Sequence, residues 1–397
     1  MEQKKQIESP QDRLTTWLIT FSCLCLILQI YAMPRNNTRF MSLANMTMLF
    51  IWLGVGGVSV VKRFVNRLPG YLFCVVWLLV FIIFSLMFSV LTAGGSITAN
   101  ITAIVNFFAL PIMLLYAAIY HIPERAKKII LVMNVLLSWV FIDLYFSGYR
   151  NAYTNYYGTT NIGALTLGFS NPNQTAMFLF ACAVVLGVSV FYFKSMIIRL
   201  GVTLDLVFIC KMLFDTESRT AFLAILVFSA LVALSFKRRL TNKWILYAMV
   251  APAVYAACAL FLRAYFGDVT FLGESIFTGR ERIYDRYLTN LNLINFMMGD
   301  FGKFRFDNLH NGYISIVATA GIFSLINFII FLRRGLERNL VRLGQTRYSK
   351  VAFIGFLATI IYSSSEAAFF VGGSTYAYMI FVVYLLFSQP YVELDYK

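Results

Sequence analysis

The sequence contains little charge. Only 13% of its 397 residues are Asp, Glu, Lys or Arg, whereas 60% are hydrophobic. Soluble globular chains are about a quarter charged, so the composition excludes an ordinary soluble protein. We therefore predict an all-α polytopic membrane protein that forms a single integral membrane domain over residues 1–397.

Cysteine is also scarce, and its placement excludes a thiolate metal site. All six cysteines lie inside apolar runs, and none has zinc-ligand spacing within a polar loop. Such cysteines are typical of small buried hydrophobic residues. We expect no disulfide and no metal–thiolate site among Cys23, Cys25, Cys74, Cys182, Cys210 and Cys258.

Several other features are absent. No small-residue cleavage site follows the first apolar run, so we expect an uncleaved first helix rather than a signal peptide. No repeat at a solenoid period is visible, and the loop pattern lacks the two-halves symmetry of many transporters. A basic stripe with stacking aromatics in a soluble fold is missing, so the net charge of +15 does not indicate a nucleic-acid partner.

Long apolar runs dominate what is present. Runs of about 17–25 apolar residues can cross a bilayer, and we expect about 12 of them. The seventh is interrupted by Arg199, Asp205 and Lys211. The expected spans are 14–33, 41–61, 70–92, 101–120, 129–147, 174–193, 196–213, 219–236, 244–262, 311–332, 351–370 and 374–388.

Basic residues predict the orientation. If the N-terminus is cytoplasmic, most of the 33 Lys and Arg residues fall in cytoplasmic segments, as the positive-inside rule requires. Both termini are then cytoplasmic. His121 ends the fourth expected span beside a cytoplasmic basic cluster, where we give it a structural role.

Two of the expected outer loops are long. The loop 148–173 contains Arg150 and Asn173 among tyrosines, glycines and amides, which suits carbohydrate binding but is equally typical of a turn-rich connector. The loop 263–310, between the ninth and tenth spans, is expected to be partly helical and to act as a lid.

The loop 263–310 contains closely spaced arginines. Arg280, Arg282 and Arg286 lie within seven residues of one another. A guanidinium group binds phosphate oxygens in a bidentate manner, so Arg280 is a candidate ligand for a diphosphate. Arg282 and Arg286 are weaker substrate-binding candidates, because acidic residues alternate with them and a solvated charged helix explains the pattern as well.

A second arginine opens the eighth span. Ser218 is a candidate N-cap, and Arg219 then lies at a helix N-terminus where backbone and side chain both favour an anion. An arginine at this depth indicates function by default, with pairing to Asp215 or Glu217 as the structural alternative. Asp215 and Glu217 could also bind Mg²⁺, but no further ligand cluster is evident, so we expect no metal.

His310, one of only two histidines, ends the long loop. A neutral imidazole can accept a proton near neutral pH, and a helix N-terminus with nearby arginines would keep it neutral. His310 is therefore a candidate general base. Asn308, Asn311 and Tyr313 are candidates for fixing its tautomer, and Asn311 and Tyr313 are also candidates for binding substrate.

Three short motifs then resemble a known family. The stretches Ser218–Ala224, Gly279-Arg280 with Tyr284, and His310-Asn311-Gly312-Tyr313 are similar in order and expected side to the O-antigen ligase and Wzy-type O-antigen polymerase superfamily. The stretch Gly168–Met177 looks like the polymerase members. The resemblance implies a GT-C-like fold, in which Arg219 and Arg280 bind a donor pyrophosphate and His310 activates the acceptor hydroxyl, without cofactor or metal.

The resemblance also implies a reaction and its setting. The chain is expected to be a polysaccharide polymerase of the bacterial inner membrane, with an active site facing the periplasm. It would transfer a growing glycan from undecaprenyl pyrophosphate to a lipid-linked repeat unit, with inversion. Membrane lipids and a chain-length regulator protein are further expected partners. The alternatives are an O-antigen ligase acting on lipid A–core and, from another class, a lipid-linked oligosaccharide flippase.

Overall fold

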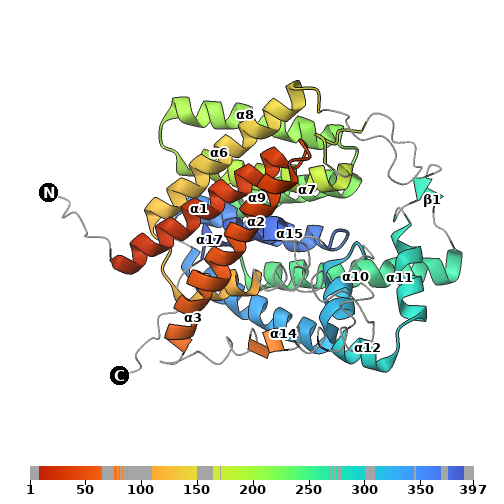
Figure 1. Cartoon of the computed structure of the whole chain (residues 1–397). Coiled ribbons are helices and arrows are strands. Elements are labelled where there is room, and N and C mark those ends of the chain that lie inside the picture. The colour runs from red at the N-terminus through yellow and green to blue at the C-terminus, as the bar shows by residue number, and fades with distance from the viewer. Residues whose placement is uncertain are drawn as a thin grey trace.

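The structure is a computed structural model of the chain (Figure 1). It describes residues 9–64, 76–77, 79–80, 83, 87, 110–149, 164–169, 171–267, 270–271, 274–275, 277, 279–299, 309–343, 346–367 and 374–388.

The described chain is almost entirely helical. Helix α1 (Pro10–Ala32) begins at a capping box, in which Ser9 Oγ accepts from the Asp12 N–H and the Asp12 carboxylate accepts from the Ser9 N–H. The other elements are α2 (Thr38–Leu49), the π-helix η1 (Phe50–Gly56), α3 (Gly57–Phe64), α6 (Glu124–Phe146), α7 (Pro172–Tyr192), α8 (Met196–Asp215), α9 (Arg219–Lys237), α10 (Asn242–Phe266), β1 (Thr270–Phe271), β2 (Glu274–Ser275), α11 (Arg280–Thr289), α12 (Leu293–Met298), α14 (Gly312–Arg342), α15 (Arg347–Tyr362) and α17 (Ser374–Leu385).

Seven helices within the described ranges are long and apolar enough to cross a membrane. They match seven of the expected spans, and the segment Arg39–Lys62 joins α2, η1 and α3. The chain is therefore a helical multi-pass membrane protein. The expectation of about 12 spans is not confirmed as a count. Most of 70–92 and 101–120 lies outside the described residues, of which Leu110–Ile119 forms a short apolar helix.

Three further expected spans differ from the prediction. Helix α8 has 20 residues, but Arg199, Asp205 and Lys211 keep it from the spanning composition. Helices α15 and α17 have 16 and 12 residues and are shorter than a bilayer-spanning helix. Cys258 is exposed on α10, so the expectation that the cysteines are buried is wrong for this residue.

The centre of the molecule is α15, with α7 and α9 packed against it on one side and α10 on another (Figure 1). Twelve of the 16 residues of α15 are buried. At Gly355 the backbone approaches Val184 of α7 so closely that a Cβ would collide with its side chain. Small residues permit such close helix contacts when both partners are apolar on all sides.

Helix α14 is broken where the long loop docks. Gly321 interrupts it with φ 81° and ψ 168°, a conformation that essentially only glycine adopts. A Cβ on Gly321 would collide with the Met297 carbonyl of α12, and a Cβ on Gly299 would lie 2.5 Å from the Ala320 nitrogen. The two glycines thus seat α12 in the break of α14, which attaches the segment 263–310 to the helix that follows it.

Candidate functional site

Arg280 begins helix α11 and points into the protein. Gly279 occupies the N-cap position with φ 79°, which turns the chain into the helix without steric cost. The Arg280 side chain is 7% exposed, and its Nη2 lies 3.0 Å from Glu366 Oε1. Burial by itself would lower the pKa of Arg280, but the Glu366 carboxylate together with Tyr255 and Tyr284 outweighs burial and raises this pKa, so the pair is ionic.

Glu366 is the residue on which the site is centred, and our sequence analysis missed it. It follows the C-terminus of α15, and its side chain is 2% exposed. The available signal was its position as the only charged residue between Lys350 and Glu393. A lone carboxylate in an apolar run indicates function, because burying it without a partner is expensive.

His310 contacts the other oxygen of the same carboxylate. Its Nδ1 lies 3.5 Å from Glu366 Oε2, and its side chain is 22% exposed. The backbone of His310 has φ 46°, a left-handed conformation that costs a non-glycine residue about 1 kcal/mol or more. The Tyr284 hydroxyl donates to the His310 carbonyl at 3.2 Å and helps to hold this conformation.

Tyr284 is suited to that role because burial raises the pKa of its phenol, so the hydroxyl stays protonated and remains a donor. Tyr284 is fully buried in α11. Tyr255 of α10 also interacts electrostatically with Arg280. Both phenols therefore lie close to the buried guanidinium group.

Asn311 connects the site to three helices. Its Oδ1 accepts from the backbone N–H groups of Tyr313 and Ile314 and thereby caps α14. Its Nδ2 donates to the carbonyls of Pro252 and Ser364, each at 2.9 Å. Asn311 is completely buried, so it positions His310 and the segment leading to Glu366. The expected contact of Asn311 with substrate stays a prediction.

Tyr313 is likewise buried and structural, because its hydroxyl donates to the Met249 carbonyl of α10 at 2.7 Å. The substrate-binding role expected for Tyr313 stays a prediction, and its hydroxyl bonds Met249 rather than His310. The group next to the His310 ring is instead the Glu366 carboxylate.

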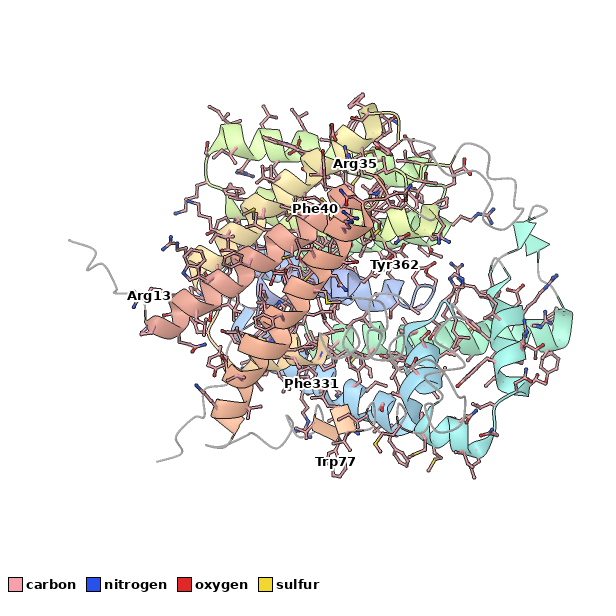
Figure 2. All side chains as sticks on the ribbon, viewed as in Figure 1. Arg13, Arg35, Phe40, Trp77, Phe331 and Tyr362 are labelled. Carbon is pink, nitrogen blue, oxygen red and sulfur yellow. The ribbon has the colours of Figure 1, made fainter. Side chains whose placement is uncertain are left out.

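The two neighbours of Arg219 connect its position to the same region. Ser218 and Thr220, on either side of it, interact electrostatically with Tyr362, which in turn interacts with Glu366 and Arg280. Tyr362 lies at the end of α15 that points toward α11 (Figure 2). The Arg219 side chain is exposed. Ser218 occupies the N-cap position, but its side chain makes no capping bond, so that expectation holds only for the backbone.

The other predicted site residues lie further out. Arg282 and Arg286 are exposed on α11, and their neighbour Asp285 pairs with Arg263 at 3.0 Å. Asn173 is half-buried in the first turn of α7. Its neighbour Gln174 interacts with Tyr376, which also interacts electrostatically with Glu366. Arg150 and Asn308 lie outside the described residues.

The residues considered for a metal do not form a cluster. Asp215 pairs with Lys211 at 2.5 Å. Glu217 is exposed with φ 56°. Across the part of the chain that the structure describes, no group of three or more His, Cys, Asp or Glu residues could hold a metal ion.

Comparison of the chain with protein-family models, with curated proteins and with solved structures finds no match. The class of protein therefore follows from the fold and the site alone. It is a helical multi-pass membrane protein in which a buried arginine–glutamate pair meets a partly exposed histidine at helix ends.

Proposed function

We propose that this chain is a membrane glycosyltransferase that polymerises a polysaccharide. It transfers a growing glycan from undecaprenyl pyrophosphate to the terminal sugar of a lipid-linked repeat unit, on the outer face of a bacterial cytoplasmic membrane. In this proposal Arg280 and Arg219 hold the donor pyrophosphate, and His310 takes the proton of the acceptor hydroxyl.

One observation carries the proposal: Arg280 and His310, from the two ends of the segment 279–310, contact the two oxygens of one buried carboxylate. A buried ion pair contributes little to stability, because desolvation offsets the attraction. The grouping of three ionisable side chains, one of them a partly exposed histidine, is therefore better explained by a catalytic role than by a contribution to stability.

The geometry suits a general base. A carboxylate next to Nδ1 favours the tautomer that carries its proton there, which leaves the Nε2 lone pair to accept a proton. General bases of this kind typically contribute about 10²–10⁴ in rate. The acceptor oxygen then attacks the anomeric carbon, and the bond to the pyrophosphate breaks with its electron pair on the phosphate oxygen. Arginines stabilise the charge that develops there.

The test is an in vitro assay with purified protein and defined lipid-linked repeat units. Wild-type protein should join the units, and His310→Ala should lower turnover by about 10²–10⁴-fold. The variant should still insert into the membrane and keep the free energy of unfolding of the wild type. Normal chain extension by His310→Ala would disprove the assignment of the base.

The same material separates the alternatives. In liposomes with repeat units supplied only on the outside, a flippase would form no new glycosidic bond. In a deletion strain, loss of a polymerase leaves single repeat units on the lipopolysaccharide core, whereas loss of a ligase leaves the core bare. The cluster lies at helix ends rather than at mid-helix between repeats, which favours transfer over transport.

A further inference from the structure

We propose that Glu366 changes partner during the reaction, and that donor binding drives the change. In the resting site the carboxylate neutralises Arg280. The donor pyrophosphate binds Arg280 in place of Glu366, and the Glu366 carboxylate then interacts only with His310. This inference rests on the proposed function and makes Glu366 a positioning residue that completes the base only when the donor is bound.

The contacts show one carboxylate shared between two donors. Glu366 Oε1 lies 3.0 Å from Arg280 Nη2, and Oε2 lies 3.5 Å from His310 Nδ1. The shorter contact is the charge-assisted one, and a good contact of that kind measures about 2.7–2.9 Å. The longer one exceeds the roughly 2.7–3.2 Å of an N–H···O hydrogen bond, so it is an electrostatic contact that a small movement would close. The resting carboxylate therefore belongs mainly to the arginine, with the histidine within reach.

The competition follows from the chemistry of the guanidinium group. Carboxylate and phosphate oxygens bind it in the same planar, bidentate manner. The edge that faces Glu366 cannot bind both ligands fully at once. A site whose binding-competent form is only partly populated binds its ligand more weakly by that fraction. Glu366 should thus weaken donor binding in the resting protein.

Release from Arg280 changes what Glu366 does for His310. A carboxylate already paired with a cation is a poor partner for an imidazolium ion. Once the pyrophosphate neutralises Arg280, the full charge of Glu366 faces Nδ1–H. The proton from the acceptor hydroxyl then moves to Nε2, as the new glycosidic bond forms and the pyrophosphate leaves. The acceptor is consequently activated only in the presence of a donor.

The test compares binding with turnover in Glu366→Gln, using inorganic pyrophosphate as the probe. The variant should bind pyrophosphate at least about tenfold more tightly than wild type, because the competing carboxylate is gone. Its turnover with lipid-linked substrates should fall by about 10² or more. If Glu366 had only a structural role, the substitution would weaken pyrophosphate binding and lower turnover together. Tighter binding combined with slower turnover therefore identifies the change of partner.

Two variants serve as controls. Asp285→Asn removes a negative charge from α11, the helix of Arg280, where exposed Asp285 pairs with half-buried Arg263. It should change pyrophosphate affinity by less than about threefold, since exposed charges are screened. Arg280→Lys should weaken pyrophosphate binding in wild type and in Glu366→Gln alike, because a point charge cannot reproduce the fork.

A second measurement reads pyrophosphate binding in wild-type protein and needs variants only to assign the signals. The chain has only two histidines, so ¹⁵N-labelled imidazole signals can be assigned with His121→Gln and His310→Gln. Pyrophosphate should shift the Nδ1 signal of His310 and leave that of His121 unchanged.

The outcomes separate the two proposals. Pyrophosphate binding that depends on Arg280 but is equal or weaker in Glu366→Gln, or an unmoved His310 signal, would overturn the change of partner and leave the proposed function standing. If wild type and Glu366→Gln both fail to bind pyrophosphate in an Arg280-dependent manner, the proposed function fails and the change of partner fails with it.

Discussion

Replacing Asn311 tests whether the scaffold beneath the site determines its geometry. The side chain makes four hydrogen bonds, two as the N-cap of α14 and two to the carbonyls of Pro252 and Ser364. Loss of an N-cap costs about 1 kcal/mol. Loss of two buried hydrogen bonds costs about 0.5–1.5 kcal/mol each. Asn311→Ala should therefore lower the free energy of unfolding by about 2–4 kcal/mol.

Asn292 provides the matched control. It caps α12 by accepting from the Asn295 N–H at 2.7 Å, and its side chain is exposed. Asn292→Ala should cost only about 1 kcal/mol. Aspartate caps a helix as well as asparagine, so Asn292→Asp should be nearly neutral. Asn311→Asp should be strongly destabilising, because it places a buried carboxylate against two carbonyl oxygens.

The assay has two readouts. Unfolding in detergent, followed by denaturant titration, gives the free energies, and turnover with lipid-linked repeat units gives the effect on His310. A displacement of about 1 Å at the base can cost about 10² in rate, so Asn311→Ala should lose activity beyond its loss of stability. An Asn311→Asp protein as stable as wild type would refute the reasoning, as would equal effects at Asn311 and Asn292.

Two further predictions concern the packing of α12 into the break of α14 and the expected independence of the reaction from metal ions. Gly321→Ala should lower the free energy of unfolding by about 2–5 kcal/mol, because it strains the backbone and collides with Met297. Gly201→Ala is the control, since a Cβ there meets open space, and it should be neutral or slightly stabilising. Similar stabilities of the two variants in detergent would contradict the packing of α12 into the break of α14. Chelators should leave transfer unaffected, and inhibition reversed by Mg²⁺ or Mn²⁺ would point back to Asp215 and Glu217.

The sequence by itself was sufficient for the class of fold and for two members of the cluster. Membrane-spanning helices can be predicted from the length and composition of apolar runs, because each span must satisfy its backbone hydrogen bonds internally. Arg280 and His310 could be selected because ionisable side chains are rare in such a chain, and rare charges are retained where they act. The expected count of spans was not confirmed, since α15 and α17 are shorter than their apolar runs.

Only the tertiary structure decided how these residues meet. Glu366 joins Arg280 to His310 across segments that are distant in sequence, and no local pattern encodes which carboxylate a buried arginine will contact. The role of Asn311 depends on the carbonyls of Pro252 and Ser364, which belong to other elements. Periodicity and caps are local properties, whereas the pairing of buried charges depends on how helices pack, because desolvation forces each charge to find a partner wherever the fold provides one.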